Sequence, residues 1–413
     1  MSRNLQNAIQ SIRQNKLRSV LAGFGIAWGL FLLIIFLGVG NGFKNGVMDM
    51  FNGYARKSLF VYGGQTSMAT KSLNEYTDIR FRQPLERDLQ ARYGVIEACS
   101  PEASLLSMPV SAEGGSSIAT VKGVTSDYFR IKILDVRDGR TLDRLDDYYG
   151  RHVAVIGEGV GQTLFGKGTG LGKRVKVGDA LFEVVGILSS EDLFSMQERN
   201  TVYLPFSSFV SCFNTDGTFS SFCASLSAKA ETSEIEKDMQ GYLARRYGFD
   251  PHDANALYIA DIETQTASFE SLFHGLGLLV WMIGVCLLLS GIVGVCNVML
   301  IIVKERTNEI GIRKAVGATP GAIISMIMTE SVIVTVCAGG VGIVLGVGAV
   351  FLADKVLLPL FKTDLMSRLE INGTVVIAAL VLLCLCGILA GLFPALKASQ
   401  ITPVDAIRYA NRE

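Results

Sequence analysis

Four long apolar runs constrain this chain more than any other feature of its sequence. They cover residues 19–40, 275–303, 322–353 and 374–396. A helix needs about 20 mostly apolar residues to cross a hydrocarbon core about 30 Å thick, because each residue adds about 1.5 Å. Each run is long enough, so the sequence predicts a membrane protein with four transmembrane helices.

The composition agrees with this class. Hydrophobic residues make up 49% of the chain and charged residues only 18%, far from the average of soluble proteins. The formal net charge is zero, which removes any whole-chain argument for nucleic-acid binding. We therefore expect the lipid bilayer, and no nucleic acid, as its surroundings.

The distribution of basic residues predicts the topology. The loop at residues 304–321 and the tail at residues 397–413 are rich in Lys and Arg, and four bases with no acid among them precede the first run: Arg3, Arg13, Lys16 and Arg18. By the positive-inside rule, both termini and this loop are cytoplasmic. Residues 354–373 are then a short outside loop, and residues 41–274 form a large extracytoplasmic region. A cleaved signal peptide is the alternative for the N-terminus, but its apolar core is typically only about 7 to 15 residues long.

The large region is expected to be α+β, with two subdomains. Runs rich in Val, Ile, Phe and Tyr predict strands, and Gly178-Asp179 between two of them is typical of a hairpin turn. The predicted strands are 58–62, 118–124, 152–156, 174–177 and 180–188, and the predicted helices are 83–93, 159–165 and 233–247.

Two amphipathic stretches connect this region to the membrane. Apolar residues recur at helical spacing after the first run and again before the second. We predict that these stretches extend the spans into a two-helix stalk; the alternative is two local helices of the outside domain. The candidate stalk residues are Val47, Met50, Phe51, Phe269 and Phe273.

The insert between the second and third runs reads KERTNEIGIRKAVGATPG. Its acids, Glu305 and Glu309, lead and its bases, Arg313 and Lys314, follow, which favours a helix through the dipole and through side-chain pairing. Gly317 is expected to end that helix. The apolar content, which a solvated loop does not need, predicts contact with a groove on a soluble partner through Ile310, Ile312, Ala315 and Val316.

Glu330 is an acid inside the third apolar run, near its cytoplasmic end. An intramembrane carboxylate is a functional candidate, here for dimer contact or gating. The alternative is an interfacial acid bonded to a partner. Small residues four apart predict close helix packing within or between protomers; they are Gly25 and Gly29, Gly342 and Gly346, and Gly387 and Gly391.

Signs of catalysis are weak. The three histidines, His152, His252 and His274, are widely spaced, so we expect no metal site and no catalytic residues. Residues 161–167 match the start of a phosphate loop, but Gly168 stands where Ser or Thr should bind magnesium. We interpret this as a chance match and predict no cofactor on this chain. Cys212 and Cys223 could form a bridge or remain free thiols.

The layout and three motifs resemble one family. Residues 14–19 read QNKLRS, residues 305–318 read ERTNEIGIRKAVGA, and residues 394–407 read PALKASQITPVDAI. They resemble the basic amphipathic helix (here within residues 1–18), the coupling segment and the C-terminal signature of the MacB/FtsX/LolC family of ABC transporter permeases. Three segments of the outside region, 123–129, 153–157 and 184–188, are similar to strands of the MacB branch.

This resemblance implies a function and its partners. It implies a permease of a MacB-like efflux or secretion pump in the bacterial inner membrane, in which a cytoplasmic ABC ATPase moves the stalk and the periplasmic domain. The implied partners are a second permease protomer, which forms a homodimer, and a periplasmic adaptor with an outer-membrane duct. MacB itself carries its ATPase on the same chain; this chain begins at the amphipathic helix, so ATP and magnesium are expected on a separate subunit.

Three other functions remain open at this point. Two belong to the same family: lipoprotein release of the LolC/LolE type, and regulation of cell-wall hydrolases of the FtsX type. The third is a sensor whose ATPase drives signalling instead of export. Neighbouring genes would separate them, because an adaptor gene favours efflux and a histidine-kinase operon favours sensing.

Overall fold

A computed structural model describes residues 16–166, 170–189, 198–213, 215–357, 369 and 373–402, with the side chains of 16–19 and 22 left out. The chain divides into two compact units. The first consists of Met1–Val47 and Ser271–Glu413, and the second is Met48–Glu270. Each unit is described by itself.

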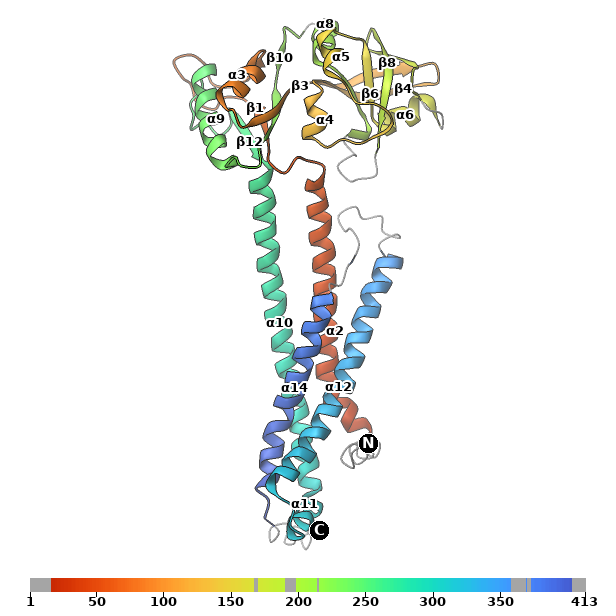
Figure 1. The fold of residues 1–413 in the computed structure, drawn as a ribbon, viewed down its shortest axis with the longest axis vertical. Helices are drawn as coiled ribbons and strands as arrows, with labels where there is room; N and C mark the ends of the chain where they lie inside the picture. The colour runs from red at the N-terminus through yellow and green to blue at the C-terminus, as the bar shows by residue number, and fades with distance from the viewer. Residues whose placement is uncertain are drawn as a thin grey trace. The chain divides into compact units, whose positions relative to one another are not determined.

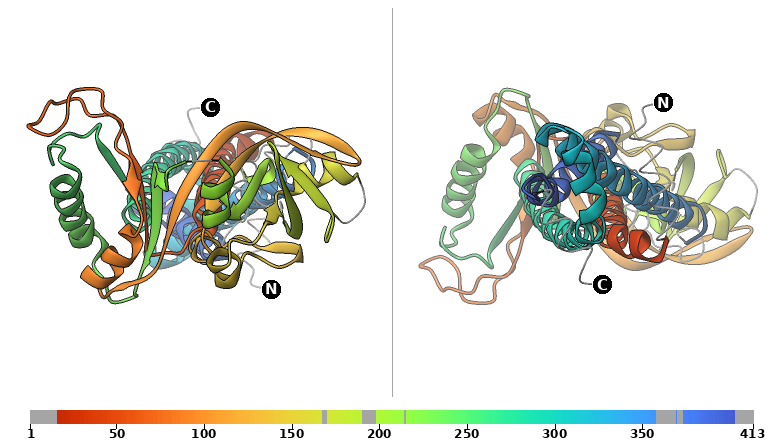
Figure 2. Two further views of the ribbon diagram at one scale, coloured as in Figure 1. Left: turned by 90° about the horizontal axis from the view of Figure 1, so that it is seen from above. Right: turned by 90° about the horizontal axis from the view of Figure 1, so that it is seen from below.

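The first unit is a bundle of long helices (Figures 1 and 2). In the part of the chain that the structure describes, four helices are long and apolar enough to cross a membrane. These are α2 (Lys16–Asn52), α10 (Ile262–Glu305), α12 (Pro320–Leu352) and α14 (Gly373–Ser399). A short helix, α11 (Thr307–Ala315), joins α10 to α12, and a π-helical turn, η1 (Ala353–Leu357), follows α12. The predicted number of spans is confirmed.

Glycines allow the helices of this bundle to approach closely. A Cβ atom at Gly25 would touch Gly291 of α10, and one at Gly342 would touch the backbone of Ala27 in α2. Gly391 faces Ser331 in the same way. The other three glycines of the predicted pairs, Gly29, Gly346 and Gly387, also face another helix of the bundle. Small residues that bring backbones together are the usual basis of helix packing in membranes, so here the glycine pairs act within one protomer.

The second unit is an α+β domain built on one large sheet. Its strand order is β12-β1-β11-β3-β4-β9-β6-β8-β5, and β7 pairs with both β3 and β8. In chain order the elements are β1 (Ser58–Gly63), β2 (Phe81–Arg82), α3 (Leu85–Arg92), β3 (Ile96–Ala112), β4 (Gly115–Val124), α4 (Asp127–Ile131), β5 (Val136–Gly139), α5 (Arg144–Tyr148), β6 (Val153–Ile156), α6 (Glu158–Phe165), β7 (Arg174–Val177), β8 (Ala180–Leu188), β9 (Thr201–Pro205), α8 (Phe206–Phe213), β10 (Thr218–Phe219), β11 (Ser221–Leu226), α9 (Thr232–Tyr247) and β12 (Leu257–Asp261).

The domain has two lobes that share strand β3. In the sheet lobe, β12, β1, β11 and the first half of β3 lie together with helices α3 and α9 (Figure 1). In the barrel lobe, β3, β4, β9, β6, β8 and β7 each pair with the next, and β7 pairs back to β3. The barrel forms because β3 is long enough, at 17 residues, to pair with β11 at one end and with β7 at the other. The two predicted subdomains correspond to these lobes, but a continuous sheet joins them.

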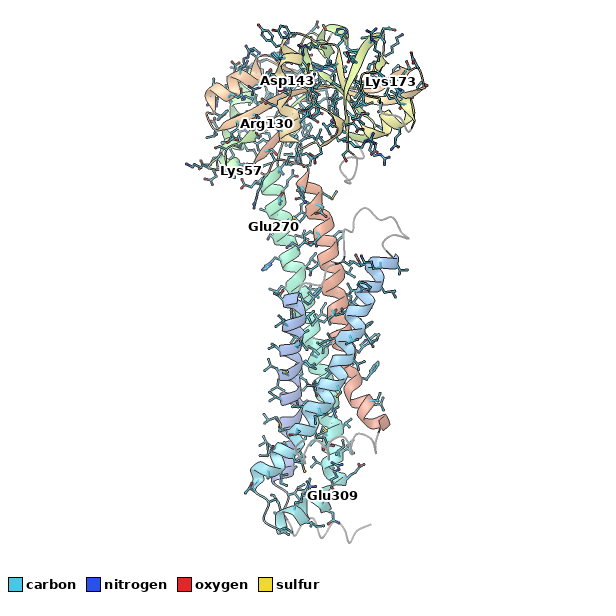
Figure 3. All side chains as sticks on the ribbon, turned by 45° about the vertical axis from the view of Figure 1, so that its right-hand side comes forward. Lys57, Arg130, Asp143, Lys173, Glu270 and Glu309 are labelled. Carbon is cyan, nitrogen blue, oxygen red and sulfur yellow. The ribbon has the colours of Figure 1, made fainter. Side chains whose placement is uncertain are left out.

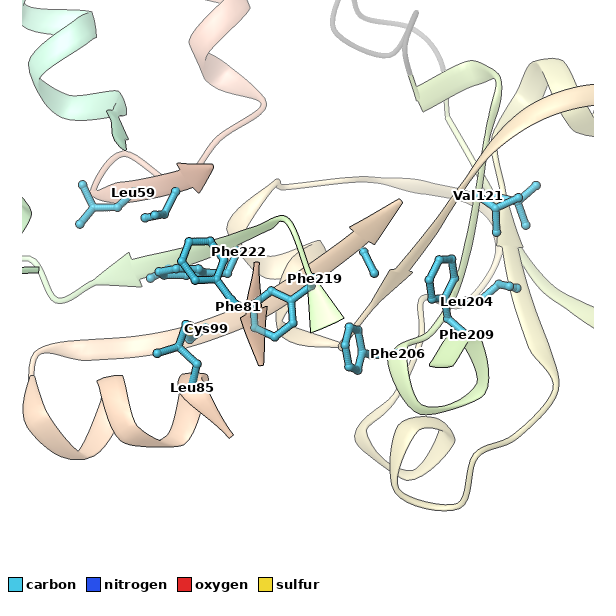
Figure 4. Packing of buried hydrophobic residues seen from close by; sticks show 14 of the residues in the cluster. Leu59, Phe81, Leu85, Cys99, Val121, Leu204, Phe206, Phe209, Phe219 and Phe222 are labelled. Atoms are coloured by element: carbon cyan, nitrogen blue, oxygen red, sulfur yellow. The ribbon is translucent and has the colours of Figure 1, made fainter. Parts of the chain in front are cut away.

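Aromatic side chains fill the core of the domain (Figure 4). Phe81 packs edge-on against Phe222, with ring centroids 5.2 Å apart, and lies 5.8 Å from Phe219. Phe219 in turn contacts Phe206 at 5.7 Å. All four rings are nearly or fully buried, so one aromatic row runs from the sheet lobe toward the barrel lobe.

The predicted elements of the domain are present, whereas several further strands were not predicted. The predicted hairpin is formed by β7 and β8, with Val177 paired to Ala180 and a positive φ at Gly178. Strand β3 was not predicted because Pro101, Pro109 and several scattered serines give it little β character. Cys212 and Cys223 are free thiols in the structure and form no disulfide with each other.

Candidate functional site

The charged segment between the second and third spans forms helix α11, which is separate from α10. Helix α10 ends at Glu305, and Arg306 occupies the N-cap position of α11 with φ −97° and ψ 15°. Glu305 and Glu309 therefore lie in different helices, which corrects the continuous charge ladder expected from the sequence. The Thr307 hydroxyl donates to the carbonyl of Lys304 at 2.7 Å. Such a side-chain bond competes with helical backbone bonding and is typical of a helix boundary.

The end of α11 follows the sequence prediction. Gly317 has φ +99°, a conformation that glycine adopts without steric cost. Its amide donates to the Lys314 carbonyl at 3.0 Å, and the amide of Ala318 donates to the Arg313 carbonyl at 3.0 Å. These two bonds form a Schellman motif, which satisfies the last carbonyls of the helix. Thr319 and Pro320 then cap and begin α12.

Helix α11 has one face toward the bundle and one toward solvent. Ile310 is 2% exposed and packs with the core of the bundle. Glu309, Ile312, Arg313 and Val316 are all exposed, and Ile312 is 57% and Val316 85% exposed. These four residues recur at helical spacing and form one stripe, here called the outer face of α11. Ile310 instead anchors the helix to its own chain, which corrects its expected place in a partner groove.

Two charged side chains tie α11 to other helices. Arg306 Nη1 lies 3.2 Å from Glu330 Oε2 of α12, and the Glu330 side chain is only 7% exposed. Lys314 Nζ donates to the carbonyl of Ile401, 2.9 Å away, and also to that of Ser399. A cation at the C-terminus of a helix is favourable because carbonyl dipoles accumulate there. Helix α11 is thus bonded to α12 and to the end of α14, and Glu330 is partner-bonded, as the alternative reading proposed.

Arg313 makes a further contact with α12. Its Nη1 atom contacts the Met326 sulfur of α12, and its side chain stays exposed. Glu309 lies on the same outer face (Figure 3). The arrangement can accept a charged and apolar partner surface, and any displacement of α11 would pull on α12 and α14 through Arg306 and Lys314.

The stalk residues lie on the two helices that pass between the units. In the first unit, the rings of Phe43 and Phe273 are 5.7 Å apart. In the second unit, Phe51 and Phe269 are 5.6 Å apart. Val47 is 7% exposed, and Met50 is half-buried. Phe43, the ring partner of Phe273, lies on the same apolar stripe but is not among the five candidate stalk residues.

The structure also places the residues that match the start of a phosphate loop. Gly161 is buried within α6, so residues 161–165 are helical and are not a loop before a helix, as a phosphate loop requires. Lys167 and Gly168 lie outside the described residues, as do residues 1–15 and 403–413. Within the described ranges no group of three or more metal-ligating side chains is found. Arg306 is a site residue that the sequence analysis did not single out, and no sequence pattern marks it.

Comparisons with known proteins agree with this arrangement. A family model for the MacB-like periplasmic core domain matches residues 19–242, and one for the FtsX-like permease C-terminal region matches residues 281–403. YknZ of Bacillus subtilis (strain 168), an uncharacterized ABC transporter permease, is 28% identical over 414 residues, covering 98% of each chain.

Similarity extends to proteins with a longer chain. The macrolide export ATP-binding/permease protein MacB of Escherichia coli is 28% identical over 411 residues, which cover 98% of this chain and 60% of that protein. The chain thus spans about 60% of the length of the MacB relatives. The crystal structure of the periplasmic region of MacB from Actinobacillus actinomycetemcomitans aligns with 53% of this chain and 95% of that one, with 19% identity and a TM-score of 0.43. Because the first family model alone covers more than half of the sequence, this chain belongs to the MacB-like and FtsX-like family of ABC transporter permeases.

Proposed function

We propose that this chain is the permease subunit of a MacB-like ABC transporter that works by mechanotransmission. A separate cytoplasmic ATPase binds α11, and its ATP-driven movement is passed through the spans to the extracytoplasmic domain. The chain lies in the bacterial inner membrane, with both termini cytoplasmic and the domain periplasmic. The printed names of its MacB relatives support export as the task.

The outer face of α11 carries this proposal. Its four side chains combine two opposite charges with two exposed branched apolar groups. Such a mixture suits an interface, where charge complementarity selects the partner and apolar burial stabilises the complex. The opposite face is fixed to α12 and α14 by Arg306 and Lys314. A push on the outer face therefore reaches two spans.

The partners follow from the same mechanism. The permease acts as a homodimer with two ATPase subunits, which supply ATP and magnesium, and a periplasmic adaptor with an outer-membrane duct receives the substrate. The stalk helices α2 and α10 are each long enough to continue from the spans into the domain. Lipoprotein release and FtsX-type regulation use the same mechanical step and differ only in what the domain engages.

Charge reversal on the outer face tests the proposal. With the full chain and its ATPase in membranes, Glu309→Arg or Arg313→Glu should lower permease-coupled ATPase turnover and transport by about tenfold or more, since like charges at an interface cost several kcal/mol. Crosslinking and size analysis should find the permease dimer intact. Lys397→Glu, an exposed reversal on α14, is the control and should have little effect. Normal coupling in both test variants would refute α11 as the coupling site.

A further inference from the structure

A network of buried charges lies inside the extracytoplasmic domain. Lys132 Nζ is 2.6 Å from Glu198 Oε1, and Lys122 Nζ is 3.0 Å from Glu102 Oε1. The hydroxyl of Tyr128, which is fully buried, accepts from Lys122 at 3.3 Å. We call these five residues the junction network. None of the four charged side chains is more than 13% exposed.

The network touches the end of stalk helix α2. That helix ends at Asn52, and the ring of Tyr54, two positions later, has Lys132 Nζ 5.7 Å from its centroid. The amide of Ala55 donates to the carbonyl of Ile131 at 2.8 Å. Two successive residues after α2 are thus held by the C-terminal end of α4.

From α4 the contacts continue into the barrel lobe. The ring of Tyr128 lies 5.7 Å from that of Tyr203 in β9, and Phe129 lies 5.4 Å from the same ring. Lys122 belongs to β4 and Glu102 to β3, both strands of the barrel. The path from α2 to the barrel therefore runs through α4.

The other stalk helix is tied to the sheet lobe. Asp261, at the end of β12, accepts bonds from the amide of Glu263 at 2.9 Å and from the hydroxyl of Thr264 at 2.6 Å, which caps α10. Glu263 in turn accepts from Thr232 of α9 at 3.0 Å and lies 3.6 Å from Lys57. These contacts all involve elements of the sheet lobe or the segment that leads into β1. Apart from its contacts with α4, α2 leads directly into β1 of the sheet lobe.

The chemistry of the network favours a mechanical role over a purely stabilising one. Burial alone would raise the pKa of Glu102, but Lys122 and Lys132 outweigh it and hold that pKa below its ordinary value. Burial would lower the pKa of Lys132, but the attraction of Glu198 and Tyr54 raises it above its ordinary value. Glu102 and Lys132 therefore stay charged at neutral pH. Buried ion pairs add little net stability compared with apolar packing, and in some proteins their role is to specify one geometry.

We infer that Lys132 is a positioning residue that makes the barrel lobe follow helix α2, so that relative movement of the two stalk helices becomes relative movement of the two lobes. This inference rests on the proposed function. Lys132 contacts Glu198 and the rings of Tyr54 and Tyr128, and it thereby fixes the end of α2 to α4. Its loss should uncouple the barrel lobe while the lower stalk still responds to ATP.

The test uses two reporters in the full chain, which is reconstituted with its ATPase. Native cysteines that react with the label are replaced by serine. The first is disulfide formation between Met50→Cys and Phe269→Cys, with and without ATP. The second is the distance between spin labels at two exposed positions, Glu183→Cys on β8 and Lys237→Cys on α9. In wild type both readouts should change with ATP. In Lys132→Met the stalk crosslink should still depend on ATP, whereas the change in label distance should fall at least threefold.

Three further variants make the result decisive. Lys132→Arg keeps the charge and should retain the lobe response, and Lys176→Met, an exposed lysine of the barrel, should behave as wild type. If Lys132→Met fails to fold, the double variant Lys132→Met/Glu198→Gln is used instead, because it also removes the buried charge of Glu198. A wild-type lobe response in the Met variants would overturn the inference. If the wild-type stalk and lobes both ignore ATP, the proposed function fails, and the inference fails with it.

Discussion

At the scale of single residues, the pair between Arg306 and Glu330 explains why an acid is tolerated inside an apolar helix. A buried carboxylate without a partner is strongly unfavourable, and the guanidinium 3.2 Å away supplies the opposite charge. The same contact fixes the boundary between α10 and α11, because Arg306 is the N-cap residue of α11. One ion pair therefore both stabilises Glu330 and lies where α11 begins.

A double-mutant cycle tests this pair. Arg306→Met should lower the free energy of unfolding by about 3 kcal/mol, because it removes this counter-charge from the buried Glu330 carboxylate. Glu330→Gln should lower it by less, because the Arg306 side chain is 30% exposed. Arg306→Met/Glu330→Met, which removes both charges, should recover most of that loss. Thermal unfolding of the full chain in detergent measures the effect, with Lys304→Met as the exposed control. Strictly additive losses in the double variant would show that the two side chains do not interact.

At the scale of the elements, α2 and α12 are in contact because one of them lacks a side chain at the crossing. A Cβ atom on Gly342 would lie 2.3 Å from the carbonyl oxygen of Ala27, which cannot move without shifting α2. Gly340, in the same helix, has no atom within 4 Å of its ideal Cβ position. The two glycines thus differ in packing but share the same helix.

This difference gives a matched pair of substitutions. Gly342→Ala should destabilise the bundle by about 1–3 kcal/mol, because overpacking forces the helices apart. Gly340→Ala should be neutral or stabilising by up to about 1 kcal/mol, since alanine is the better helix former. Comparison of the two melting temperatures in the same detergent measures the sign. Equal shifts for both variants would contradict the close crossing of α2 and α12.

At the scale of the whole molecule, the proposed coupling surface and the proposed positioning residue lie in different units of the chain. The outer face of α11 belongs to the bundle, and the junction network belongs to the domain; α2 and α10 are the helices common to both units. Within the described ranges the pattern expected of a nucleotide site is not found, because residues 161–165 are helical.

The full chain purified alone should show no ATPase activity, since phosphate binding needs amides at a helix N-terminus, a lysine and a hydroxyl for magnesium together. Adding the separate nucleotide-binding subunit should produce activity whose turnover changes with the permease. Lys167→Ala should leave transport intact. Nucleotide binding by the isolated chain that Lys167→Ala abolishes would contradict both the predicted topology and the proposal that a separate subunit binds ATP.

The sequence by itself determined the features that depend on local chemistry. Four apolar runs required four spans, because backbone groups in lipid must be satisfied within a helix. Gly317 ended α11 and Gly178 turned the β7–β8 hairpin, since few other residues adopt a positive φ readily. The charged insert and the terminal motifs were enough to identify the family.

Only the tertiary structure decided which residues meet across long separations. Nothing local marks Arg306 as the partner of Glu330, or turns Ile310 inward while Ile312 faces out. Strand β3 carries little strand signal, and its pairing with both β11 and β7 depends on neighbours far along the chain. Lys132 and Glu198 look like ordinary surface charges until the fold buries them together. Long-range contacts of this kind arise from packing, which cannot be read from residue types and their local spacing.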